Sequence, residues 1–186
     1  MTLELNDVMI EGEPHKLSLI AEAGKLTCLT GDGPDRLGRW LLVMLGFIPT
    51  THGFVCIDGE PFSERSAAMF RQFMAYAPAC LEEVGEIVRY APPSVQDVFR
   101  LQANAERPIS NGILSEEIRQ IGSGEDDGRT RLLAVAVLLG KPILLVDNPP
   151  AEALSYLQQQ ARKDCTVIVA STLDAIVGGA DVVVKV

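Results

Sequence analysis

Short apolar runs alternate with segments of helical spacing along most of the chain, and turn residues separate them. We predict strands at Leu3–Met9, Lys16–Ile20, Lys25–Thr30, Phe54–Asp58, Met74–Ala77, Pro142–Val146, Thr166–Ala170 and Asp181–Val184. We predict helices at Leu37–Leu45, Ser66–Phe73, Gln96–Ala105, Glu116–Gln120, Thr130–Leu139 and Glu152–Arg162. This alternation indicates an α/β fold with a mostly parallel sheet flanked by helices, and the first two strands indicate a small N-terminal antiparallel part.

Composition narrows this picture to one acidic domain. The chain has 186 residues, 47% of them hydrophobic, which predicts a single domain over residues 1–186. Acidic residues outnumber basic ones by 25 to 16, so nucleic acid and anionic membranes are not expected partners. The start of the chain lacks the basic-then-apolar pattern of a signal peptide, and the apolar run Trp40–Ile48 is too short to span a bilayer. We therefore expect a cytoplasmic protein with no segment inserted in the membrane.

Cysteine and histidine usage gives no metal-ligand pattern. The chain has four cysteines and two histidines, and no two cysteines form a CxxC pair. We predict reduced thiols and no metal site. The residues are Cys28, Cys56, Cys80, Cys165, His15 and His52.

The stretch LTGDGPDRLGRWLL, residues 29–42, follows an apolar strand and opens into a hydrophobic helix, as a phosphate-binding loop does. LGFIPTTHGFVCIDG continues from that helix into a strand, and RLLAVAVLLGKPILLVDNPP joins a later helix to a buried strand. In this order the segments resemble the nucleotide-binding domain of ABC (ATP-binding cassette) transporters over nearly the whole chain. The resemblance implies a P-loop NTPase-like fold, in which ATP binds between two domains and its hydrolysis drives a membrane partner. It also implies a helical insertion, reduced here to approximately residues 95–128.

The phosphate loop lacks the groups that an intact G-x-x-x-x-G-K-[ST] loop supplies. One register uses Gly33 and Gly38, so that Arg39 replaces the lysine and Trp40 the hydroxyl residue. A gap-free register to the glycine that ends the helix puts Leu37 at the lysine and Gly38 at the hydroxyl. Neither register supplies a ligand for Mg²⁺. We treat the loop as vestigial, and its residues are Gly31, Gly33, Gly38 and Arg39.

Other residues of the loop oppose phosphate binding. Pro34 removes a backbone donor, and Asp32 and Asp35 place negative charge near the expected phosphates. Upstream, where the family stacks an aromatic residue on adenine, the stretch VMIEGEP has none. Arg39 remains as the alternative phosphate cation, with a planar fork in place of a compact ammonium group.

The strand ILLVD is the best preserved of the family's motifs and ends in Asp147, which the resemblance implies would hold Mg²⁺. The next residue, implied to be a glutamate that activates water, is Asn148, whose amide is no useful base. Asn148 is expected to form part of the turn. We interpret Asp147 and Asn148 as a vestigial pair.

Three further family positions are altered. Ala79 occupies the place of a glutamine, and Ser123 and Gly124 retain a trace of the signature segment within the acidic loop GSGEDDG. Thr172, or Ser171, replaces the switch histidine. For these two hydroxyls we expect a helix amino-terminal cap.

The apolar skeleton is retained while the chemical groups are lost, which favours a non-catalytic ABC-ATPase-like protein that needs no cofactor. Its expected partner is a protein: an active ABC ATPase, a transporter's membrane permease subunit or a second copy. The alternative is a divergent ATP-binding subunit that binds or hydrolyses Mg-ATP with help from a partner. A third possibility is an unrelated ligand-binding domain that reuses the same crevice.

Overall fold

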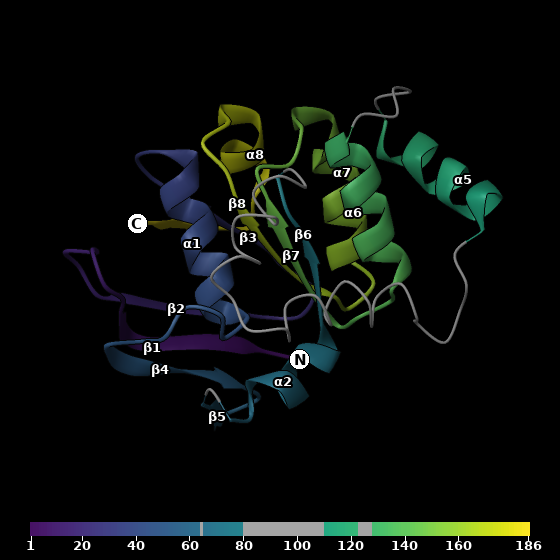
Figure 1. Cartoon of the computed structure of the whole chain (residues 1–186). Coiled ribbons are helices and arrows are strands. Elements are labelled where there is room, and N and C mark those ends of the chain that lie inside the picture. The colour runs from purple at the N-terminus through teal and green to yellow at the C-terminus, as the bar shows by residue number, and fades with distance from the viewer. Residues whose placement is uncertain (64, 80–109, 123–127) are drawn as a thin grey trace.

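Helix α1 (Pro34–Met44) lies between two sheets in the computed structural model, which describes residues 1–63, 65–79, 110–122 and 128–186 (Figure 1). The first sheet is antiparallel and has the strand order β2-β1-β4-β5. Its strands are β1 (Leu3–Met9), β2 (Leu17–Ala21), β4 (His52–Ile57) and β5 (Glu60–Phe62). The buried positions of β2 alternate with exposed ones, as expected for a sheet with one covered face.

The second sheet is parallel and has the strand order β6-β7-β8-β3-β9. Its strands are β3 (Leu26–Thr30), β6 (Met74–Ala77), β7 (Ile143–Asp147), β8 (Thr166–Ala170) and β9 (Val182–Lys185). All residues of β6, β7 and β8 are buried, as in parallel sheets that are covered on both faces.

Helices cover the face of the parallel sheet that is turned away from α1 (Figure 1). They are α5 (Asn111–Ile121), α6 (Gly128–Leu138), α7 (Leu154–Ala161) and α8 (Asp174–Gly179). Shorter elements are α2 (Ala67–Phe70) and 3₁₀ turns at Arg71–Phe73 and Ala151–Ala153. Helix α5 packs on α6 and α7, so it forms an outer layer beyond the sheet.

Alternation along the parallel strands divides the apolar interior into two cores. Ile143 and Leu145 of β7 face α1 and the antiparallel sheet, whereas Leu144 and Val146 face the helices on the other side. Because side chains of a strand point alternately to opposite faces, one continuous apolar run supplies both cores. Trp40 of α1 is among the largest fully buried side chains of the first core.

The structure confirms the predicted fold class: a mostly parallel sheet flanked by helices, with a small antiparallel part at the start of the chain. Three strands have the predicted bounds, namely Leu3–Met9, Met74–Ala77 and Thr166–Ala170. The short elements β5 and α8 are absent from the prediction. Asp58 and Gly59 both have positive φ, as the tight turn between β4 and β5 requires.

Two helix predictions need correction. The first helix begins at Pro34 and not at Leu37, because proline favours the first helical position. The helix predicted at Glu116–Gln120 extends over Asn111–Ile121, with Ser110 as its N-cap. The predicted helix at Gln96–Ala105 lies outside the described residues, as does most of the predicted helical insertion. The limit of one domain at residues 1–186 stays a prediction.

Within the described residues, no helix is both long enough and apolar enough to cross a membrane.

Candidate functional site

Three parallel strands end at one edge of the sheet, where the predicted site residues meet. Asp147 is in register with Ala170, and Leu29 pairs with the same Ala170. The backbone N–H of Asn148 donates to the carbonyl of Ala170 at 2.8 Å, and that of Ser171 donates to the carbonyl of Leu29 at 3.0 Å. The ends of β3, β7 and β8 therefore bring the loop after residue 30 beside the vestigial Asp147–Asn148 pair. Such strand ends are the usual position of ligand crevices in open α/β sheets.

The segment after β3 is a short turn followed at once by helix. Gly33 is the N-cap of α1, with φ of 82°, and no side chain caps this helix. Pro34 has no N–H, and the N–H of Leu37 donates to the carbonyl of Gly33 at 3.4 Å. Residues that an intact loop would leave open around a phosphate are thus wound into the first turn of α1. The Leu37 side chain, at the lysine position of the gap-free register, is buried in the core.

Gly38 packs directly against Asp147. A Cβ added to Gly38 would lie 2.5 Å from Oδ2 of Asp147, closer than real Cβ contacts allow, and 3.2 Å from its Cγ. Gly38 is the hydroxyl position of the gap-free register, so the Asp147 carboxylate fills the space where a serine or threonine side chain would begin. Trp40, the hydroxyl position of the other register, is buried in the first core.

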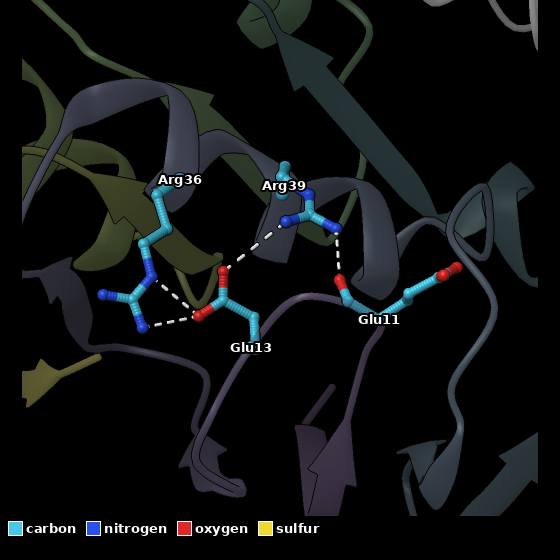
Figure 2. A network of polar contacts seen from close by, with 4 residues as sticks. All are labelled: Glu11, Glu13, Arg36 and Arg39. Carbon is cyan, nitrogen blue, oxygen red and sulfur yellow. Dashed lines mark hydrogen bonds and ion pairs between the residues drawn. The ribbon is translucent and has the colours of Figure 1, made fainter.

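Arg39 is directed toward the loop between β1 and β2 (Figure 2). Its guanidinium donates to the backbone carbonyl of Glu11 at 2.7 Å and lies 3.6 Å from Oε1 of Glu13. Arg36 forms the closer pair with Glu13, through Nη2 at 2.5 Å and Nε at 2.7 Å from Oε2. The arginine predicted as an alternative phosphate cation is therefore paired with carboxylate and carbonyl oxygens of the same chain.

Electrostatics agree with this pairing. The hydrogen bond with Glu13 raises the pKa of Arg36, partial burial opposes the rise, and the charges of Glu13 and Asp32 add to it. The Glu13 side chain is only 2% exposed, and a buried carboxylate of this kind is expected to be paired. Sequence reasoning did not identify Glu13 or Arg36. The available signal was a carboxylate in VMIEGEP, the stretch where an aromatic residue is implied.

No protein-family model matches the sequence, and no curated protein matches it at a significant level. Solved structures do match. The ATP-binding subunit of an ABC transporter superposes with a TM-score of 0.68 at 16% identity, covering 100% of this chain and 86% of that one. A nucleotide-free ATP-binding cassette gives 0.69 at 13% identity, covering 100% and 87%. A dimeric bacterial ABC transporter cassette gives 0.66 at 13%, covering 99% and 94%.

The chain has the fold of an ATP-binding cassette. The resemblance inferred from the order of the sequence segments is thereby confirmed at the level of fold. At such low identities the likeness does not extend to chemistry, which depends on the residues that this chain places at the strand ends.

Asn148 forms the turn that follows β7. Its φ is 44°, in the left-handed region where asparagine is more readily accommodated than most residues. Two prolines follow and lead into the 3₁₀ turn at Ala151–Ala153. The backbone at Asn148 is held by its hydrogen bond with Ala170, which agrees with the turn role expected from the sequence.

The two hydroxyl residues after β8 differ in position. Ser171 is buried, and its Oγ accepts a hydrogen bond from the N–H of Leu173 at 3.2 Å. Thr172 is exposed. The N-cap of α8 is Leu173, and no side chain caps that helix, so the predicted capping role of Ser171 or Thr172 is wrong. Ser171 instead closes the turn that precedes the helix.

Within the described residues, the remaining family positions add no chemical group at these strand ends. Ala79 follows the end of β6 and is buried. The signature trace, Ser123 and Gly124, lies outside the described residues. The site therefore consists of a closed turn, a carboxylate packed on a glycine, and a carboxylate-bridged pair of arginines.

Proposed function

We propose that this protein is a non-catalytic ABC-ATPase-like subunit that acts through protein contacts, as a scaffold or regulatory partner. The observation that carries the proposal is the contact between Gly38 and Asp147. A magnesium ion at this point would need a hydroxyl ligand from α1 and space in front of the carboxylate. Gly38 supplies no hydroxyl, and the carboxylate fills the space into which a longer side chain would extend.

The lost groups act on one reaction, so their effects cannot be added as independent terms. The loss of a general base alone lowers a rate by about 10²–10⁴-fold. Asn148 stands at that position, in a turn conformation. Leu37 stands at the lysine position and is buried. These positions together support the proposal that the chain retains the packing of the fold but lacks the groups needed for catalysis.

The retained packing supports a role for the folded surface. One core lies between α1 and the parallel sheet, and the other lies between that sheet and the helices α6 and α7. An active ABC ATPase, a permease subunit or a second copy are the partners that such a surface would serve. The alternative, a divergent ATPase completed by a partner, is supported by the retention of Asp147 at the strand end.

Titration of Mg-ATP into the purified chain, followed by calorimetry, tests the proposal. We expect no binding at micromolar concentrations. Micromolar affinity for Mg-ATP would contradict the proposed non-catalytic role.

A phosphate-release assay, with and without candidate partners, separates the two functions. The non-catalytic subunit should add no turnover of its own. Turnover that depends on this chain and disappears in Asp147→Ala would establish the divergent ATPase instead.

A further inference from the structure

The carboxylate of Glu13 lies between two arginines of α1, and it is supplied by the loop that joins β1 to β2 (Figure 2). The Glu13 side chain is 2% exposed, whereas those of Arg36 and Arg39 are 31% and 40% exposed. One carboxylate thus satisfies both guanidinium groups, through Oε2 on Arg36 and Oε1 on Arg39. A buried acid of this kind is stable because it is paired on both sides.

Arg36 and Arg39 are also the two basic residues of the stretch 29–42, the segment that replaces the phosphate loop. Both guanidinium groups converge on a single point, and that point is occupied by a side chain of the same molecule. Guanidinium groups bind carboxylates and phosphates through the same planar, bidentate geometry. An oxyanion brought to these arginines would therefore compete directly with the Glu13 carboxylate.

We propose that Glu13 is an autoinhibitory side chain, which occupies an oxyanion position formed by Arg36 and Arg39 and excludes phosphate-class anions from it. The inference rests on the proposed function, because it accounts for how a chain with two arginines and no lysine in this segment would exclude phosphate. A tethered carboxylate competes at an effective concentration on the order of millimolar or higher, so it displaces a weak free anion.

Neighbouring acids require a matched control. The charge of Asp32 acts on Arg36, and Glu11 carries a further negative charge on the loop that contacts Arg39, so removing either acid lowers the general repulsion of an anion. Glu11 contacts Arg39 through its backbone carbonyl, so Glu11→Ala removes one charge and leaves both ion pairs in place. Glu13→Ala removes one charge and the ion pairs together.

Titration of sodium pyrophosphate at low ionic strength, followed by calorimetry, tests the proposal in the whole chain. Glu13→Ala should bind pyrophosphate at least tenfold more tightly than the wild type and than Glu11→Ala. Adding Arg36→Gln and Arg39→Gln to Glu13→Ala should abolish the gain. Because Arg36 and Arg39 are partly exposed, water can solvate them in the Glu13→Ala variant, and we expect it to fold.

An equal gain in Glu11→Ala would overturn the proposal, since the effect would then be general charge repulsion. No gain in a Glu13→Ala variant that keeps wild-type circular dichroism would overturn it as well. Glu13→Gln, judged by the same tenfold criterion, replaces a Glu13→Ala variant that does not fold. If the wild-type chain does not bind Mg-ATP and Glu13→Ala does not bind pyrophosphate more tightly, only this inference is contradicted. Wild-type binding of Mg-ATP removes the proposed function.

Discussion

The carboxylate of Asp147 and the backbone of Gly38 are packed so closely that any side chain at position 38 would displace the acid. Gly38 lies inside α1, where glycine costs about 1 kcal/mol relative to alanine. The contact therefore explains why a residue that weakens the helix is accommodated there. It also links the missing hydroxyl and the position of the acid as two parts of one packing arrangement.

We expect Gly38→Ala to destabilise the wild-type chain. Overpacking costs about 1–3 kcal/mol, which exceeds the helix-propensity gain of about 1 kcal/mol. In an Asp147→Ala background the obstruction is gone, and the same substitution should stabilise the chain by up to about 1 kcal/mol. Urea unfolding of the wild type, Gly38→Ala, Asp147→Ala and the double variant measures this reversal of sign. The fluorescence of the single tryptophan, Trp40, reports the unfolding. Additive effects would show that the two residues are not in contact.

Arg36 and Arg39 should differ in their contributions to stability. Arg36 approaches Glu13 to 2.5 Å and Arg39 to 3.6 Å, so Arg36→Ala leaves the buried carboxylate with its weaker partner. We expect Arg36→Ala to lower the free energy of unfolding, because the buried carboxylate loses its closer partner, and Arg39→Ala to lower it less. The midpoints of denaturant unfolding compare the two variants, provided that the dependence of the free energy of unfolding on denaturant concentration is the same for both. Equal costs for the two variants would contradict the observed geometry.

Stability should fall at alkaline pH because two thiols are buried. Burial raises the pKa of Cys28 and of Cys165 from 9.0 to about 11. The folded state thus keeps these protons to higher pH than the unfolded state, and stability is lost as pH rises from about 9 to about 11. Each thiol contributes up to about 2–3 kcal/mol to this loss, at about 1.4 kcal/mol per pKa unit.

Cys165→Ala isolates that contribution, since Cys165 is only half-buried and its removal leaves a smaller defect than removal of Cys28. In reducing buffer, the variant should lose less stability than the wild type between about pH 9 and pH 11. Parallel pH curves for the two proteins would mean that the thiol is already ionised or already exposed in the folded state.

Tyr156 connects α7 to the outer helix α5. Its side chain is buried, and its hydroxyl donates to Oε1 of Glu117. Burial first, and then this hydrogen bond, raise the pKa of Tyr156, so the phenol stays protonated. Tyr156→Phe should loosen α5 by about 1.5–3 kcal/mol, the range for a hydrogen bond to a charged group.

Hydrogen exchange resolved along the sequence measures this effect. Amides of Asn111–Ile121 should exchange faster in Tyr156→Phe, while amides of β7 remain protected. Glu117→Gln retains an acceptor for the hydroxyl and should disturb α5 less. A uniform change over the whole chain would indicate global destabilisation and would contradict a local link.

The sequence was sufficient for the parallel core, because continuous apolar runs bounded by turn residues leave few alternatives. The strands Met74–Ala77 and Thr166–Ala170 are examples. The start of α1 was misplaced because the apolar helical spacing begins only at Leu37, whereas the helix-starting preference of Pro34 sets its first residue. For the turn after β8, the strand register decides which neighbouring hydroxyl points inward, so Ser171 and Thr172 were indistinguishable beforehand.

The ion pairs of Glu13 with Arg36 and Arg39 could not be predicted from the sequence. Its acid belongs to the loop after β1 and its arginines to α1, and only the folded chain brings these segments together. An ion pair between loops leaves no periodic pattern in the sequence. The missing lysine and hydroxyl residue of the phosphate loop, by contrast, could be read directly from the sequence. An intact phosphate loop requires fixed residue types at fixed spacing.

Strand β3 has consequences for how the chain acquires its structure during synthesis. It lies between β8 and β9, where Leu26 pairs with Val167 and Thr27 with Val182. During synthesis, this early apolar segment therefore stays unpaired until residues 166–185 have been made. Contacts between such distant parts of a sequence form slowly, and the intermediates that precede them are prone to aggregation. Until β8 and β9 flank it, β3 leaves both of its edges open to pairing with other chains.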